Sequence, residues 1–189
     1  MKIFIMKIFT NNLGITVLVD ILVWVIFHLG IGYWSSRIPV DRFDYDSPFY
    51  RSKPWEKDGE AYQKLFKVRS WKKYIPSGAA LYKDAYEIKY VIDFSVNNIK
   101  LWLKESCRSE FCHWVMILPG FLFFLWNPNW LAWLMVAYAI LNNAVPIIMQ
   151  RYNRPRVRRL LERLEAKANN VIKDMPIHED QQTLSHSYE

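Results

Sequence analysis

The chain has 189 residues, enough for one domain; 52% of them are hydrophobic, 16% are aromatic and nine are tryptophan. A soluble domain of this size rarely needs so many tryptophans, whereas amphipathic rings are favoured at the bilayer interface, so the composition favours a membrane protein. The net charge is +7, but Lys and Arg are absent from residues 8–36 and 109–150. Basic residues confined to the flanks of apolar segments favour anionic lipid headgroups as partners and argue against nucleic acid.

The first apolar segment covers residues 13–33. Its 21 residues suit a hydrocarbon core of about 30 Å at a helical rise of 1.5 Å per residue. Two lysines precede it, so a cleaved signal peptide is an alternative, but the following Tyr-Trp-Ser-Ser-Arg is not an A-x-A type cleavage site. We therefore assign residues 1–36 to an uncleaved transmembrane anchor. Asp20 and His28 are expected to share one face of this helix and to have a structural role.

A polar segment follows over residues 37–112, and 15 of the 25 Lys and Arg residues lie between Arg37 and Arg108. Prolines and aromatic residues divide its first part into short elements. The apolar spacing predicts one helix over residues 56–67. It predicts a longer amphipathic helix over residues 91–112, which could lie along the membrane surface. We expect this segment to be cytoplasmic or interfacial.

Residues 113–150 read as a transmembrane hairpin. Its first apolar run, Trp114–Trp126, has 13 residues, which form about 20 Å of helix. This is too short to cross a membrane, so the span must also include the helical turns before Trp114. Pro119 and Gly120 should kink this arm. The turn is expected at residues 127–129, and residues 131–150 are long enough for a full span.

The orientation follows from the distribution of basic residues. Residues 1–36 contain two, the middle segment 15, and residues 151–189 eight, so the last two segments are expected in the cytoplasm. The C-terminal segment should form a basic helix over residues 157–167, followed by a polar, disordered tail. The predicted fold class is an all-α integral membrane protein of the cell membrane: an N-terminal anchor, a cytoplasmic aromatic-rich helical segment and a C-terminal transmembrane hairpin.

The ionisable residues at the foot of the hairpin are the candidates for chemistry. His113 lies three residues after Glu110, within side-chain reach on a helix, and a carboxylate can orient an imidazole as a general base. The alternative is an interfacial histidine that only makes a structural hydrogen bond. Cys107 and Cys112 fit no zinc or haem pattern and read as small residues in a reduced compartment. We predict no bound metal or cofactor.

A cationic patch follows the second arm of the hairpin. Guanidinium groups bind phosphate through paired hydrogen bonds, so the patch could hold a phosphorylated acyl donor. The alternative is a stop-transfer signal that contacts lipid phosphates. Pro155 inside the patch predicts a specific local turn. The patch consists of Arg151, Asn153, Arg154 and Arg156.

Several blocks between residues 34 and 161 resemble the glycosyl-4,4'-diaponeurosporenoate acyltransferase family of bacterial staphyloxanthin-type carotenoid biosynthesis. The resemblance implies a small membrane enzyme that transfers a fatty acyl chain to a sugar hydroxyl of a glycosylated carotenoid. The blocks are Ser36–Pro39, Trp55–Gly59, Phe66–Lys72, Glu105–Trp114 and Pro146–Arg156.

On this reading, His113 is the general base and Glu110 orients it, while Glu105 is an alternative base. Arg108 or Arg151 would stabilise the developing oxyanion. Arg154 and Arg156 would bind the donor, which is expected to be acyl-CoA or acyl carrier protein. Three residues of the Phe66–Lys72 block join that binding set: Arg69, Trp71 and Lys72. A rival hypothesis is a non-enzymatic membrane scaffold or subunit of a lipid-synthesis complex.

Overall fold

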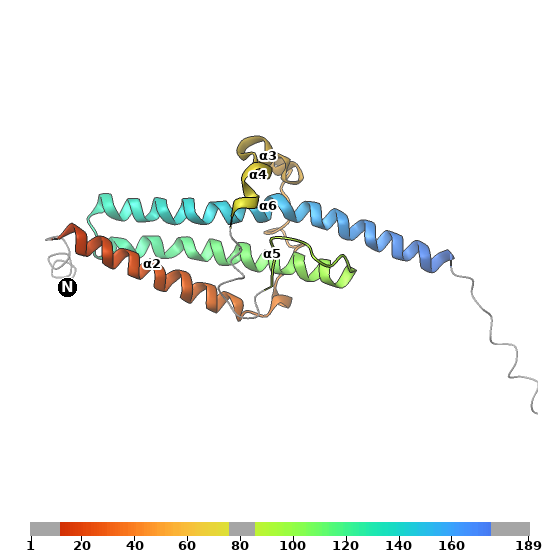
Figure 1. The fold of residues 1–189 in the computed structure, drawn as a ribbon, viewed down its shortest axis with the longest axis horizontal. Helices are drawn as coiled ribbons and strands as arrows, with labels where there is room; N and C mark the ends of the chain where they lie inside the picture. The colour runs from red at the N-terminus through yellow and green to blue at the C-terminus, as the bar shows by residue number, and fades with distance from the viewer. Residues whose placement is uncertain (1–11, 76–85, 175–189) are drawn as a thin grey trace, which may run out of the picture.

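A computed structural model describes residues 12–75 and 86–174, and all regular secondary structure within these residues is helical, without a β-strand. Three long elements lie side by side (Figure 1): α2 (Leu13–Ser36), α5 (Val96–Ile117) with its continuation η5 (Leu118–Leu125), and α6 (Asn129–Asp174). The predicted all-α class is confirmed. The first 11 residues of the predicted anchor, residues 76–85 of the polar segment and the polar tail predicted at the C-terminus lie outside the described residues.

Two of the described helices are long and apolar enough to cross a membrane, namely α2 and the first part of α6. Much of their apolar surface is not covered by the rest of the chain. On α2, large aliphatic side chains such as Leu18, Leu22 and Ile26 are exposed, and on α6 the same is true of Trp133 and Leu141. An apolar surface of this extent marks a site of contact with a membrane or with another protein.

The break predicted at Pro119 and Gly120 is present. The α-helical part of α5 ends at Ile117, and the chain continues as the 3₁₀ helix η5 before the turn at residues 126–128. Gly120 is needed here because a Cβ atom would lie 3.1 Å from the Cβ of Ala139 on α6. Small residues thus allow η5 and α6 to pack closely, as they do between membrane helices.

The helix α6 is longer than either of the two helices that the sequence predicted for this part of the chain. It runs without interruption through Pro146 and Pro155, so the turn predicted at Pro155 is wrong. Its 46 residues extend over about 69 Å. The second arm of the hairpin and the basic helix predicted at residues 157–167 are one element. A proline removes one helical hydrogen bond, and here contacts with α5 and the middle segment hold the helix together around it.

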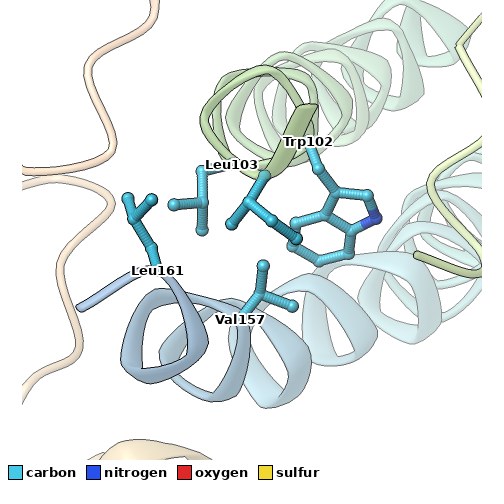
Figure 2. Packing of buried hydrophobic residues seen from close by; sticks show 5 residues of the cluster. Trp102, Leu103, Val157 and Leu161 are labelled. Carbon is cyan, nitrogen blue, oxygen red and sulfur yellow. The ribbon is translucent and has the colours of Figure 1, made fainter. Parts of the chain in front are cut away.

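The predicted surface helix at residues 91–112 is instead the first half of α5. Ser95 caps it by accepting a hydrogen bond from the backbone N–H of Asn98, so the helix begins at Val96. Its apolar face packs on α6. Figure 2 shows this contact, in which Trp102 and Leu103 meet Val157 and Leu161.

Residues 49–75 of the middle segment form a small cap against α6 (Figure 1). The single helix predicted at residues 56–67 is two elements, the 3₁₀ helix η2 (Pro54–Gly59) and α3 (Glu60–Phe66). Lys57, Asp58 and Gly59 have positive φ angles, which break the helical path between them. Short elements complete this part of the chain: η1 (Val40–Arg42), α4 (Val68–Trp71) and η3 (Lys72–Tyr74).

Gly59 is where the cap comes closest to α6. A Cβ atom at this position would lie 2.8 Å from the backbone oxygen of Tyr152 and 2.8 Å from Nη1 of Arg156. Its φ of +84° is also a conformation that glycine adopts without strain. The glycine of the Trp55–Gly59 block therefore permits both the turn and the contact.

Candidate functional site

A buried ionic cluster lies where the cap, α5 and α6 meet. Arg151 on α6 donates from Nε to Oε1 of Glu110 at 2.7 Å and from Nη1 to Oε1 of Glu56 at 3.2 Å. Nη1 of Arg154 lies 2.7 Å from Oε2 of Glu110. The four side chains are all at most 9% exposed, and two carboxylates balance two guanidinium groups. Pairing of this kind is what allows charges to be buried.

The same guanidinium groups also bind the backbone of the cap. Arg151 donates from Nη2 to the carbonyl of Phe49 at 2.7 Å, and Arg154 donates from Nη1 to the carbonyl of Tyr50 at 3.1 Å. Arg154 also donates from Nη2 to the carbonyl of Ser106 at 3.0 Å. The cluster therefore fastens three separate segments of the chain to one another.

These contacts change the roles expected for three predicted site residues. Glu110 is bound by Arg151, Arg154 and the indole N–H of Trp114, so it does not serve as the orienting partner of His113. Arg151 and Arg154 are engaged with carboxylates and carbonyl oxygens. We therefore assign them to holding the fold together and no longer to binding an oxyanion or phosphate. Glu56, which the sequence analysis gave no role, belongs to the same cluster.

His113 is oriented by an amide of α6. Its Nδ1 lies 2.8 Å from Oδ1 of Asn143, and Nδ2 of Asn143 donates to the carbonyl of Ala139 at 2.8 Å. Because that carbonyl can only accept, the amide is oriented with Oδ1 toward the imidazole. In the neutral ring, Nδ1 then carries the proton and Nε2 carries the lone pair. A base with this tautomer could accept a proton from a hydroxyl group.

Asn142, the residue before Asn143 on α6, forms a second histidine–asparagine pair with His28. The sequence did not predict this pair. Nδ2 of Asn142 lies 3.1 Å from Nε2 of His28, and Nδ1 of His28 lies 2.8 Å from the carbonyl of Trp24. The consecutive residues Asn142 and Asn143 thus contact histidines from α2 and α5. The sequence showed each residue but gave no signal that α2 would meet α6 at this level.

Asp20, near the N-terminal end of α2, binds the turn of the hairpin. Its Oδ1 accepts from Nε1 of Trp126 at 2.8 Å, and both oxygens accept from Nδ2 of Asn127, at 3.0 and 2.9 Å. The expected structural role of Asp20 has this physical basis.

Arg108 and Glu105 form a separate contact near the C-terminal end of α2. Arg108 Nη2 lies 2.7 Å from Glu105 Oε2, and Nη1 donates to the carbonyls of Ser36 and Ile38 at 3.2 and 3.3 Å. Burial raises the pKa of the Glu105 carboxyl, and the positive charge of Arg108 opposes that shift. The pair joins α2 to α5, and we assign it this role in place of catalysis.

The remaining predicted donor-binding residues gather around the ring of Tyr152. Arg156 stacks over this ring at 3.8 Å, and the ammonium group of Lys72 lies 5.2 Å from its centroid. Arg69 donates from Nε to the hydroxyl of Tyr152 at 2.9 Å, and Lys72 donates to Oδ1 of Asn153 at 3.2 Å. From here on, the cationic patch means Arg69, Lys72 and Arg156, which shares only Arg156 with the patch predicted from the sequence.

The cationic patch keeps guanidinium and ammonium groups at the surface, since Arg69 is exposed and Lys72 and Arg156 are half-buried. Burial lowers the pKa of Arg156, and the charges of Arg69 and Arg159 lower it further, although Tyr152 opposes them. Clustered positive charge is stabilised by an anion, so this patch can bind a phosphate group. Trp71 is not part of it, because its indole N–H donates to the carbonyl of Phe66 at 2.7 Å.

Both cysteines are free thiols and buried. Burial raises the pKa of Cys107 to about 12, which makes it unreactive at neutral pH. Within residues 12–75 and 86–174, no group of three or more His, Cys, Asp or Glu side chains is arranged to hold a metal ion.

Known proteins resemble this chain over most of its length. The family described as glycosyl-4,4'-diaponeurosporenoate acyltransferase matches residues 46–163. Proteins of that name from Staphylococcus aureus strains MRSA252 and Newman are 33% and 34% identical over 144 residues, which cover 76% of this chain and 87% of each relative. No solved structure matches the chain. The family match and these relatives show that the chain belongs to the glycosyl-4,4'-diaponeurosporenoate acyltransferase family and is an acyltransferase.

Proposed function

We propose that the protein transfers a fatty acyl chain from a thioester donor to a sugar hydroxyl of a glycosylated carotenoid in the cell membrane. The acceptor follows the name of the relatives from Staphylococcus aureus. Membrane residence is supported by α2 and the first part of α6, whose exposed surfaces are apolar. Contact between such surfaces and lipid costs no free energy, whereas their contact with water does. The rival scaffold hypothesis is set aside because the family consists of acyltransferases.

The orientation proposed is the one that the basic residues favour, with residues 37–112 and 151–189 in the cytoplasm. The cationic patch then faces the compartment that contains acyl-CoA and acyl carrier protein. Arg69, Lys72 and Arg156 bind the phosphate groups of the donor. Both donors carry phosphate next to the pantetheine arm, so the patch alone does not distinguish them.

The observation that carries the proposed mechanism is the fixed tautomer of His113. Its Nε2 takes the proton of the acceptor hydroxyl while that oxygen attacks the thioester carbonyl. The tetrahedral intermediate expels the thiolate, which recovers the proton from the imidazolium. One ester bond forms, one thioester bond breaks, and the histidine returns to its starting state. Asn143 keeps Nε2 available by accepting from Nδ1.

The test compares two variants of this pair. His113→Gln keeps a hydrogen-bonding side chain but cannot take a proton at neutral pH, so ester formation should fall 10²–10⁴-fold, the usual loss on removing a general base. Asn143→Ala should lose less, because the imidazole remains and only its orientation is relaxed. The measurement is the rate of ester formation in membranes at matched protein levels.

A control variant with the same chemistry is His186→Gln, which changes a histidine 73 residues further along the chain and keeps the proposed base. It should retain far more turnover than His113→Gln. If His113→Gln forms ester at a near-normal rate, the general-base role is wrong and His113 is structural.

A further inference from the structure

A groove runs along the outside of the helical bundle between α2 and α6. Its volume is about 630 Å³, within the usual range for a small-molecule site. Apolar side chains dominate the lining, and its polar residues stand near the two ends. The lining residues include Val17, Ile21, Trp24 and Val25 from α2, and Leu134, Met135 and Tyr138 from α6.

The groove has one end that is suited to a reacting carbonyl group. His28 and Asn142 line it there, and the residue next to Asn142 is Asn143, which orients His113. This end lies toward Ser36, about 12 Å from that helix terminus at 1.5 Å per residue. The carbonyl of a chain seated in the groove would therefore lie at Asn142, one residue before the asparagine that orients the proposed base.

The other end of the groove is lined by Val17 and Ile21. Asp20 lies there, but it is only 2% exposed and its oxygens are bound by Trp126 and Asn127. The ring of Trp24 stacks on Phe123 with centroids 4.9 Å apart, which fixes the floor of the groove. Hydrogen bonds at Asp20 and ring packing at Trp24, in the middle of the groove, thus hold two parts of its wall in place.

The length of the groove limits its occupant. From Val17 to Leu29 the helix rises about 18 Å. An extended chain advances about 1.2 Å per backbone bond, so about 15 bonds fit. That is the length of a long-chain fatty acyl group. A rigid polyene that crosses the hydrocarbon core needs about 30 Å and exceeds the groove.

We propose that this groove binds the fatty acyl chain of the donor, with its thioester carbonyl beside His28 and Asn142 and its methyl end toward Val17. The length of the groove then determines which length of acyl chain the protein prefers. This inference rests on the proposed function, since it identifies where that reaction holds its donor. The acceptor polyene must lie elsewhere on the apolar surface.

A substitution that shortens the groove tests the proposal. Ile21 lies seven residues from His28, about 10.5 Å, which leaves room for about nine bonds when a tryptophan fills position 21. Ile21→Trp should therefore move the preferred donor from about 15 carbons to about nine. Val17→Trp should shorten it by only one or two carbons.

The matched control is Ile26→Trp. It places the same side chain on the same helix, at a position that is 68% exposed and outside the groove lining. This variant should keep the wild-type chain-length profile. The measurement is the distribution of acyl chains in the ester product when a mixture of donors from 8 to 18 carbons is supplied to vesicles that contain the protein.

A second measurement does not depend on turnover. A donor analogue with a photoactivatable diazirine at the methyl end should label residues near Val17 in the inactive His113→Gln variant. Excess unlabelled donor should prevent that labelling, and excess phospholipid should not. If phospholipid prevents it, or if labelling falls on residues outside the groove, the site holds bulk lipid or the chain binds elsewhere, and the proposal is wrong.

The two hypotheses fail in different ways. An unchanged chain-length profile in active Ile21→Trp refutes the groove while leaving acyl transfer intact. Absence of ester formation in the wild-type protein refutes the proposed reaction, and competitive labelling near Val17 would still support the groove as an acyl-chain site.

Discussion

Neutralising Glu110 should destabilise the protein much more than neutralising an exposed glutamate. Glu110 is fully buried, and it is paired with Arg151 and Arg154, which are 9% and 4% exposed. Glu110→Gln leaves these two guanidinium groups with one carboxylate, that of Glu56. Removing one partner of a buried ion pair costs about 3–5 kcal/mol, because the remaining charge is buried without compensation.

The matched control is Glu165→Gln. Glu165 forms a salt bridge of 2.8 Å with Lys100, but the two side chains are 40% and 44% exposed. Such surface pairs add little to stability, because water and salt screen both charges. The same chemical change is therefore made in a pair with a similar distance and a different environment.

The assay is thermal unfolding of both variants in the same detergent, followed by circular dichroism. For a chain of 150–250 residues, 1 kcal/mol corresponds to about 2–4 °C, so Glu110→Gln should lower the Tm by roughly 6 °C or more. Glu165→Gln should change it by less than about 4 °C. Equal shifts would refute the assignment of the cluster to stability. A normal Tm with lost activity would return Glu110 to the orienting role first expected for it.

Four further predictions follow from the geometry. A maleimide should leave Cys107 and Cys112 unmodified at pH 8 until the protein is denatured, and rapid native labelling would contradict their burial. Ser70→Cys, an exposed position, should react with a membrane-impermeant maleimide only after permeabilisation; reaction in intact cells would reverse the topology. Arg156→Lys should raise the donor KM with little change in kcat, and an unchanged KM would exclude this donor site. Gly59→Ala should lower stability by about 1–3 kcal/mol, measured by thermal unfolding.

The sequence was informative wherever a local rule decides the structure. The lengths of the apolar runs predicted α2 and the hairpin, and Pro119 with Gly120 predicted the break at η5. Pro155 was misleading because tertiary contacts support the helix around it. The helix at residues 91–112 was placed on a membrane surface since its apolar face looks the same whether lipid or α6 covers it.

The sequence predicted which residues lie near the site, but it did not predict which side chains contact one another. Glu110 and His113 are three residues apart, yet each finds its partner on α6, 41 and 30 residues away. Such choices depend on how helices pack, which spacing along one helix does not reveal. Glu56 was quoted only as part of a motif, because nothing local shows that its carboxylate meets Arg151, 95 residues away.

The ionic cluster also has a consequence for synthesis of the chain. Glu56 and Glu110 are translated 95 and 41 residues before Arg151, which neutralises both. Until Arg151 and Arg154 have left the ribosome, the two carboxylates have no guanidinium partners and must stay hydrated, so the cap cannot close on the bundle. The last step of folding therefore waits for the middle of α6. A chain that stops before residue 151 lacks the guanidinium groups that join the cap to α5 and α6.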